Sequence, residues 1–488
     1  MTTAMRRKED LEEQKEAMLP TLRSKLLAPT DVEEANDRLR RFLLWQALNG
    51  VAVMTYYVVR SLYVTRIAGD NPVSGSNLAL REAVVATIAS VVGANFVPPC
   101  ADNPRVGRKP LLLLNSAVAA VQMLIMAVWP DSIDGFLGAT ALAGCFTSTM
   151  SVVIPVDCVA GGATARESFW RPVFGGVFAP GAPASPAPTG SRQFVVYLVD
   201  VVVAEIAAFA LGGALGVGVG TAIAIVWSIP ACLVIASATY LASLLIGAAT
   251  LRETLPPDTP APPARAFASP TALLEVLRGD PGDVELGAYV GAYVCACLAV
   301  GAIATQAPYY LLWKFDMSDT VYLEFQLTPL VAFGAGLAGY VWWARDALGG
   351  PFCLHVAALA LCLALLIMGL CNYVEGALAA LVIAGVPFAA VVQFLAIQAC
   401  VAPEHQGKLA AALQLVGGFA VALGLAAGQL LWIQLKTSAA HGSPETRADF
   451  RAGGAFYLSA IAALAMATAI WPVAKLDRSR LMPQDSFD

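Results

Sequence analysis

The chain has few charged residues and almost no histidine. Asp, Glu, Lys and Arg make up 13% of its 488 residues, 3 residues are His, and the formal net charge is -5. Soluble domains contain about 25% charged residues, so this composition argues against a soluble domain. The sequence has short basic clusters but no basic domain, which excludes nucleic acid as a partner.

Enzyme signatures and a secretory leader are also missing. The three histidines, His355, His405 and His441, are dispersed, and no HExxH, Walker loop or nucleophile elbow occurs. We therefore expect no enzyme, no cofactor and no metal site. The hydrophilic segment 1–41 has no apolar core, so no cleaved signal peptide is predicted. The ten cysteines lie in or beside apolar segments, which indicates small buried thiols without a disulfide framework or zinc.

What the chain has in excess is long apolar runs. Hydrophobic residues make up 58% of the sequence. A transmembrane helix needs about 20 predominantly apolar residues, and the alternation typical of a membrane barrel is absent. The sequence thus predicts an all-α membrane protein with twelve transmembrane helices: 42–66, 80–101, 109–129, 133–159, 193–217, 221–250, 285–313, 320–344, 351–372, 374–402, 406–435 and 451–474.

Hydrophilic segments divide these spans into two groups of six. The predicted parts are an N-terminal tail 1–41, a six-helix bundle 42–250 with a Pro/Ala/Gly-rich insert 160–192, a linker 251–284, a second bundle 285–474 and a C-terminal tail 475–488. With both termini cytoplasmic, 23 of the 30 Lys and Arg lie on the cytoplasmic side, as the positive-inside rule requires. The sequence leaves open whether the membrane is the plasma membrane or an endomembrane.

Charges within the predicted spans are unevenly distributed. They occur in the first, second, fourth, fifth and eighth spans, whereas the third, sixth, ninth and twelfth carry none in their interiors. Because a charge in a bilayer costs several kcal/mol, it usually faces the bundle interior or a water-filled cavity. The uncharged spans are therefore expected at the periphery. The charged residues are Arg60, Arg81, Glu82, Asp157, Asp200, Glu205 and Glu324.

Polar residues of the first span fall on one stripe at helical spacing, and later spans contain further polar residues. We interpret them as candidates for a solute cavity. The alternative is that they bond neighbouring helices, and that two of the tyrosines belong to an interfacial aromatic belt. The candidates are Gln46, Asn49, Tyr56 and Arg60 in the first span, Gln306, Tyr309 and Tyr310 in the seventh, Glu324 in the eighth and Gln393 in the tenth.

Glu205 is the strongest candidate for proton coupling. It lies about 20 Å along its span, near the bilayer midplane. Burial favours the neutral form of a carboxyl group, so Glu205 could gain and lose a proton as water reaches it from either side. Asp200 is a second candidate, about 140° away around the helix. A permanent hydrogen bond or ion pair inside the bundle is the alternative for both.

The loop between the second and third spans carries an acid, a glycine and three cations. Asp102 suits the positive N-terminus of a neighbouring helix, and Gly107 permits a tight turn. Arg105, Arg108 and Lys109 remain on the cytoplasmic side. We expect this loop to form part of a cytoplasmic gate.

This loop resembles the signature Gly-x-x-x-Asp-x-x-Gly-x-Arg/Lys-Arg/Lys of the major facilitator superfamily. It departs from it at Pro98 and in the four residues between Asp102 and Gly107. Two further loops resemble the tetracycline-efflux and hippocampus-abundant-transcript-like branch. They carry Asp157 and Arg166 after the fourth span, and Pro403, Glu404, Gly407 and Lys408 after the tenth.

The resemblance implies two pseudo-symmetric six-helix bundles that expose a central site to one side of the membrane at a time. It also implies that helices 3, 6, 9 and 12 are peripheral. The expected function is secondary active transport of a small organic solute, coupled to protons through Glu205, by a monomer in a lipid bilayer. The alternatives are a uniporter without proton coupling, or a non-transporting receptor or scaffold. The glycine-rich AFALGGALGVGVG of the fifth span is interpreted as close helix packing.

Overall fold

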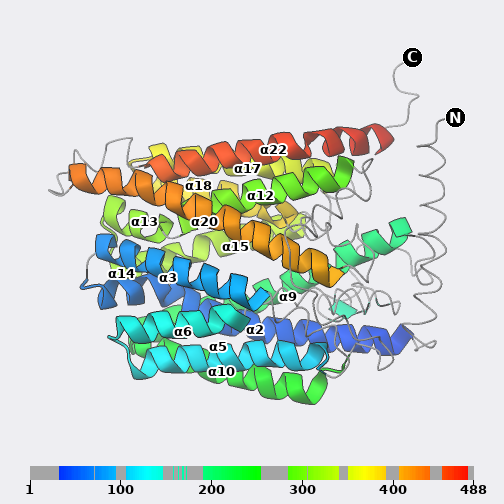
Figure 1. The fold of residues 1–488 in the computed structure, drawn as a ribbon, viewed down its shortest axis with the longest axis horizontal. Coiled ribbons are helices and arrows are strands. Elements are labelled where there is room, and N and C mark those ends of the chain that lie inside the picture. Colours follow the sequence, from blue (N-terminus) through cyan, green and yellow to red (C-terminus); the bar gives the residue numbers. More distant parts are fainter. Residues whose placement is uncertain are drawn as a thin grey trace.

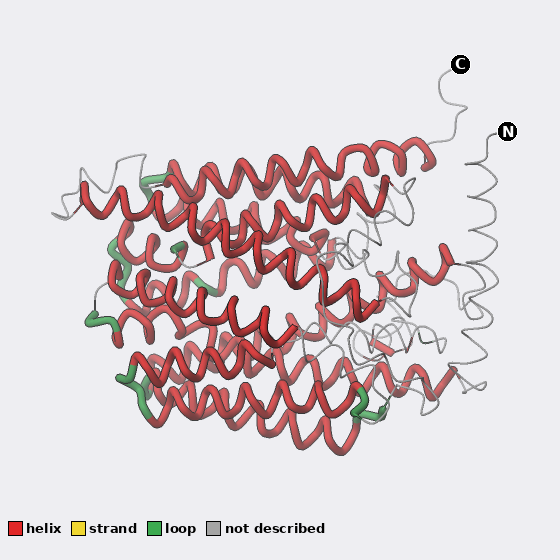
Figure 2. The backbone as a smooth tube through the Cα atoms, in the orientation of Figure 1, coloured by secondary structure: helices red, strands yellow, loops and turns green. Residues whose placement is uncertain are grey.

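The structure is a computed structural model. It describes residues 32–70, 72–94, 106–146, 158, 163, 168–169, 172, 191–253, 284–304, 306–339, 350–391, 406–439 and 453–481. In this part of the chain every regular element is a helix, and most connections between neighbouring helices that are described are short (Figure 2).

Helices occupy all twelve predicted spans. In the N-terminal half they are α2 (Val32–Ile67), α3 (Pro72–Ala94), α5 (Arg108–Val128), α6 (Ile133–Phe146), α9 (Ser191–Val226) and α10 (Ile229–Thr250). In the C-terminal half they are α12 (Val284–Ala304), α13 (Ala307–Phe315), α14 (Asp319–Phe325), α15 (Leu327–Gly339), α17 (Gly350–Leu370), α18 (Val374–Val391), α20 (Gln406–Ala439) and α22 (Gly454–Leu481). Seven of these described helices are each long and apolar enough to cross a bilayer, and the bent pair α12 and α13 makes an eighth span. The all-α membrane fold is confirmed.

The seventh and eighth spans are broken helices. The axes of α12 and α13 differ by 40°, and Pro308 lies in the first turn of α13. Pro329 similarly lies in the first turn of α15, directly after the break that ends α14. Proline has no N–H to donate and its ring clashes with the preceding turn, so each break has a local cause. The apolar runs alone predict one unbroken helix for each of these spans.

Several helix ends differ from the predicted spans. α3 begins at Pro72 instead of 80, and α22 continues to Leu481 instead of ending at 474. α2 begins ten residues before position 42, where Arg38 pairs with Glu34 at 2.9 Å and Arg41 pairs with Asp37 at 2.7 Å. Such pairs four residues apart extend a helix beyond its apolar part. α9 runs through the predicted loop 218–220 and ends at Val226, because Ser228 caps α10 by accepting the N–H of Ala231.

The two halves repeat the same pattern of helix packing. In the N-terminal half α2 packs on α9 and α10, α5 on α10 and α3 on α6; in the C-terminal half α12 packs on α20 and α22, α17 on α22 and α15 on α18. When the spans of each half are numbered from one to six, both halves pair the first span with the fifth and sixth, the third with the sixth, and the second with the fourth. The repetition gives two pseudo-symmetric bundles, as the resemblance implied.

The uncharged spans lie at the edges of the molecule. In Figure 1, α5 and α10 lie along one edge and α17 and α22 along the opposite edge. Among the described residues, the main contacts between bundles join α2, α3 and α9 to α13, α14, α15 and α20. The expected peripheral position of helices 3, 6, 9 and 12 agrees with this arrangement.

Glycines bring α2 and α9 into backbone contact. A Cβ on Gly212 would lie 1.8 Å from the carbonyl oxygen of Ala47, and one on Gly216 would lie 2.3 Å from that of Val51. Gly50 makes the reciprocal approach to Phe209 O, at 2.2 Å. Only glycine permits this spacing, so the interpretation of the fifth span as closely packed is confirmed.

Candidate functional site

Polar contacts between the bundles gather at one end of the molecule. We call it the outer end, since the sequence predicts that its loops 68–70 and 316–318 face away from the cytoplasm. There the Ser61 and Tyr322 hydroxyl oxygens are 2.7 Å apart, and Arg66 lies 3.4 Å from Asp319. Both contacts join α2 to the C-terminal bundle, so in the described part of the chain the bundles are tied together at this end.

A chain of amides adds a third connection between the bundles. Gln306, at the break between α12 and α13, donates to Gln429 of α20 at 3.5 Å. Gln429 in turn donates to Asn77 of α3 at 3.2 Å. Gln306 is 1% exposed and Gln429 is 4% exposed, whereas Asn77 is exposed, so the network runs from the protein interior to the surface of α3. A proline-broken helix thus supplies a polar group at the interface.

Beneath these contacts lies a buried ion pair. The Arg60 guanidinium donates through Nε to Glu82 Oε1 at 3.2 Å, and its Nη2 contacts Oε2. The side chain of Arg60 is 18% exposed and that of Glu82 is 8% exposed. The bidentate geometry neutralises both charges and joins α2 to α3. Arg60 was a predicted cavity residue; Glu82 was predicted only as a charge near the start of its span.

Two phenol groups close to this pair have no hydrogen-bond partner in the described part of the chain. Tyr56 of α2 and Tyr309 of α13 both interact electrostatically with Arg60 and Glu82, and the hydroxyl of each is buried. Tyr309 packs against Gly75 of α3, where a Cβ would lie 2.9 Å from its ring. The structure therefore brings together three predicted cavity residues, Tyr56, Arg60 and Tyr309, from both bundles.

Glu205 lies in a different place, between α2 and α9. It is 7% exposed, and Gln46, itself 8% exposed, donates a short hydrogen bond to its carboxylate. The two residues were predicted for different roles, yet the structure makes them partners. A carboxyl group bonded to a neutral amide can remain in place in either protonation state, because the amide can donate to it or accept from it.

Two further cavity candidates lie inside single bundles. Asn49 accepts hydrogen bonds from Ser116 of α5 at 3.3 Å and from Ser243 of α10 at 3.1 Å, so it bonds three helices together. Tyr310 accepts from Lys314 at 2.7 Å and its ring centroid is 4.7 Å from that of Phe456 of α22. These contacts favour the packing alternative for both residues.

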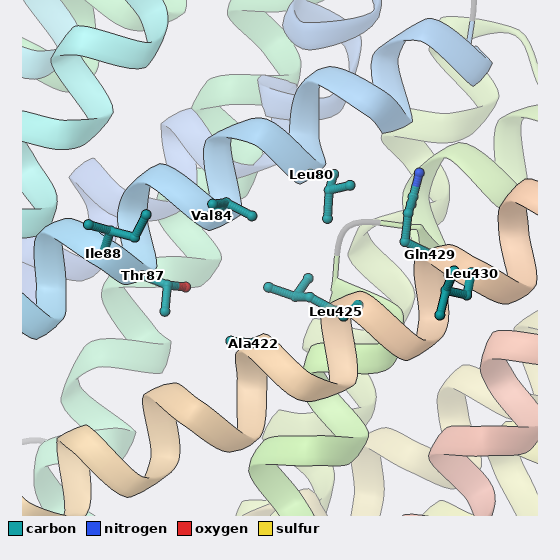
Figure 3. A pocket seen from close by; sticks show the side chains of 9 residues that line it. Leu80, Val84, Thr87, Ile88, Ala422, Leu425, Gln429 and Leu430 are labelled. Atoms are coloured by element: carbon teal, nitrogen blue, oxygen red, sulfur yellow. The ribbon is translucent and has the colours of Figure 1, made fainter.

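An apolar groove runs between α3 and α20, on another side of α3 from the ion pair. It encloses about 400 Å³. Figure 3 shows the side chains that line it. Leu80, Val84 and Ile88 line it from α3, so Glu82 points about 120–160° away around that helix. Gln429 is the amide at one end of the groove. Its exposed apolar side chains suit a crevice that faces the bilayer.

The described part of the loop 2–3 motif binds a carboxylate at the start of the linker, directly after α10. Glu253 accepts the backbone N–H of Arg108 at 3.0 Å and that of Lys109 at 3.1 Å. Gly107 has φ +78°, and a Cβ there would lie 2.2 Å from Glu253 Oε2. Lys109 Nζ donates to Ala248 O at 2.8 Å. The carboxylate thus caps the N-terminus of α5, where the helix dipole is positive.

The other predicted gate and site residues fall partly or wholly outside the described part of the chain. Gln393, Asp102, Arg105, Asp157, Arg166, Pro403 and Glu404 lie outside the described residues. For Asp200, Glu324, Gly407 and Lys408 the structure describes only the helical backbone, in α9, α14 and α20.

Several polar partners at the interface were not predicted from the sequence. Ser61, Asn77, Tyr322 and Gln429 are uncharged, and Asn77 precedes the predicted second span. Glu253 lies in the hydrophilic linker, where charged residues are ordinary. The distance of four helical turns between Gln46 and Arg60 could have indicated two separate polar sites, since it spans about 21 Å.

Comparison with known proteins gives matches in structure only. Neither a protein-family model nor a curated protein sequence matches the chain. The solved structure of the human organic anion transporter MFSD10 (TETRAN) matches with a TM-score of 0.61 and 18% identity, covering 88% of this chain and 99% of that one. A mutant of the nucleoside transporter NupG matches with a TM-score of 0.56 and 12% identity, covering 89% and 99%. The chain therefore has the fold of the major facilitator superfamily.

Proposed function

We propose that the protein is a secondary active transporter that moves a small organic solute by alternating access, coupled to protons. The observation that carries the proposal is the interface between the two bundles. It combines polar contacts at the outer end with buried ionisable groups beneath them. Contacts of this kind can break and reform when two bundles rock, and buried ionisable groups in a membrane typically mark a solute or ion pathway.

Glu205 is the proposed proton carrier, with Asp200 as a second candidate. The burial of Glu205 disfavours its charged form, and its partner Gln46 is neutral. A change of accessibility during rocking would then change its protonation. The alternative is a uniporter in which the Gln46 to Glu205 bond is a permanent link between α2 and α9.

Uptake into proteoliposomes tests the proposal. Reconstituted full-length protein is offered a solute panel with and without an imposed pH gradient. A coupled transporter accumulates its solute only with the gradient, whereas a uniporter equilibrates it in both conditions. No uptake of any solute would favour the receptor or scaffold alternative.

Two matched variants test the role of Glu205. Glu205→Gln removes the ionisable proton and should abolish accumulation driven by the gradient, while exchange of solute without net proton movement persists. Glu375→Gln makes the same change at an exposed position in the first turn of α18 and should behave as the wild type. Unchanged gradient-driven uptake in Glu205→Gln would exclude Glu205 as the carrier.

A further inference from the structure

The ion pair between α2 and α3 lies beside two hydroxyl groups that form no described hydrogen bond. Arg60 and Glu82 neutralise one another, yet the Tyr56 and Tyr309 hydroxyls beside them have no partner in the described part of the chain. An ion pair that serves only to join two helices needs no further donors. Two unused phenol donors next to a guanidinium constitute a site that can receive an additional anion.

From this arrangement we infer that Arg60 binds an organic anion, a carboxylate or sulfonate, which takes the place of the Glu82 carboxylate, and that Glu82 takes up a proton in exchange. The inference names the substrate class of the proposed transporter and so rests on the proposed function. Its site is the group of Tyr56, Arg60, Glu82 and Tyr309, and it does not depend on Glu205.

Charge balance requires the proton. With Glu82 ionised, the pair is neutral, and an incoming anion would leave two negative charges against one cation in a buried site. With one proton on Glu82, the Arg60 guanidinium and the bound anion are again a neutral pair. Such a site avoids an uncompensated buried charge in both states, which is the condition for burying an ion pair at acceptable cost.

The charged and titratable groups around Glu82 are consistent with this exchange. α2 provides Arg60, Tyr56 and Tyr63, and α13 provides Tyr309. From α20 the described hydrogen bond to α3 comes from the uncharged Gln429, and α6 has its described charge, Asp134, at an exposed outer end. Within the described residues Arg60 is thus the counter-ion of Glu82, and an anion that displaces the Glu82 carboxylate leaves Glu82 without it.

The position of the pair links anion binding to the bundle interface. Arg60 and Glu82 belong to the N-terminal bundle, whereas Tyr309 belongs to the C-terminal one. Ser61, the neighbour of Arg60, contacts Tyr322 across the interface. An anion bound by Arg60 and both phenols would therefore contact both bundles, as a solute that controls rocking must.

Ligand-dependent thermal stability of the purified full-length protein tests the inference. The probes are aromatic and aliphatic carboxylates and sulfonates, each paired with its neutral amide, and a quaternary ammonium salt as the opposite charge. Anions should stabilise the protein and their amides should not, because a ligand that binds the folded state raises its stability. Sulfonates remain ionised throughout, so their pH dependence reports the protein alone.

The pH dependence has a definite sign. Because the inferred exchange takes up one proton when a sulfonate binds, the Kd of the sulfonate should fall by up to about tenfold for each pH unit lowered. Glu82→Gln imitates the protonated state. It should bind the sulfonate at neutral pH as tightly as the wild type does in acid, with no remaining pH dependence.

Variants of Arg60 complete the test. Arg60→Gln should abolish the response to anions. Because that change leaves a buried carboxylate, the double variant Arg60→Gln with Glu82→Gln, which removes both charges, serves as a second form that retains the fold. Arg81→Gln, an exposed position beside Glu82, is the matched control and should respond as the wild type.

Three results would overturn the inference. They are equal stabilisation by anions and their amides, no response of the wild type to any anion, and an undiminished anion response in the double variant. The proposed function can fail separately. If Arg60→Gln leaves solute uptake unchanged, the protein is a transporter but the anion site is refuted. If anions bind through Arg60 but no solute is taken up, the site stands and the transport function is refuted.

Discussion

The close contact between α2 and α9 predicts that one added methyl group, in Gly216→Ala, lowers the stability of the protein. Gly216→Ala places a Cβ 2.3 Å from the carbonyl oxygen of Val51, and ordinary van der Waals contact begins at 3.4 Å. The two helices must therefore separate by about 1 Å. Overpacking of this kind costs about 1–3 kcal/mol.

Gly218 provides a control on the same helix. A Cβ there has no atom within 4 Å among the neighbours considered, so Gly218→Ala adds the same methyl group without a collision. Alanine is favoured over glycine in a helix interior by about 1 kcal/mol. Gly218→Ala should leave the stability unchanged or raise it slightly, whereas Gly216→Ala should lower it.

Cysteine reactivity provides the assay. Eight cysteines lie in the described part of the chain, none of them forms a disulfide bond, and Cys158, Cys232 and Cys353 are buried. A fluorophore that reacts with thiols therefore reports unfolding as the protein is heated. A domain of about 200 residues loses roughly 2–4 °C for each kcal/mol, so Gly216→Ala should unfold several degrees lower. Equal midpoints for the two variants would refute the close contact between α2 and α9.

Three other substitutions test the remaining contacts. Gly107→Ala should lower the unfolding midpoint, at a cost of about 1–3 kcal/mol, since alanine is strained at φ +78° and its Cβ displaces the carboxylate that caps α5; an unchanged midpoint would exclude the capped turn. Ser61→Ala removes the hydrogen bond to Tyr322, which is worth about 0.5–1.5 kcal/mol. The ratio of molecules open at the outer end to molecules closed there should therefore rise by about two- to twelvefold. Distances between spin labels at the outer ends of the two bundles measure that ratio, and an unaltered distribution would contradict the contact. Glu82→Ala should cost about 3–5 kcal/mol because it leaves Arg60 buried without a counter-ion, and replacement of both by glutamine should recover most of this, as thermal unfolding would show; a double variant as unstable as the single one would argue against a paired site.

The architecture could be predicted from the sequence because long apolar runs have one stable form in a bilayer. Each backbone polar group must be bonded within its own segment, which fixes helices at the predicted spans. Absence of charge placed the third, sixth, ninth and twelfth helices at the edge for a similar reason. Charge is costly in lipid, so its distribution reports which helices face the interior.

The partners within the site could not be predicted in the same way. Periodicity placed Gln46 and Arg60 on one stripe of α2 but could not show that they face different helices, α9 and α3. The Glu82 carboxylate was visible as a charge, yet its partner depends on how two helices pack. Asn49 shares the same stripe and is nevertheless used to bond α5 and α10.

The loop at the start of α5 illustrates another limit. The sequence predicts that Asp102 occupies the N-terminus of a neighbouring helix, and Asp102 lies outside the described residues. The acid that the structure places at the N-terminus of α5 is a different one. It is Glu253, which is more than 140 positions away along the chain and follows α10. The tight turn at Gly107 could be predicted from its residue type, whereas the carboxylate that binds there depends on the packing of α5 against α10.

The broken helices make the two halves mechanically unequal despite their common packing pattern. α2 is a continuous rod of 36 residues fastened to α9 by backbone contacts, whereas its counterpart, the seventh span, is divided into α12 of 21 residues and α13 of 9 residues. Across the outer loop from α13, α14 has 7 residues before the second break. A short segment between two proline-associated breaks can tilt without carrying the rest of its bundle. The N-terminal half is thus suited to be the stiff member of the pair, and the C-terminal half the compliant one, with Gln306 at its hinge.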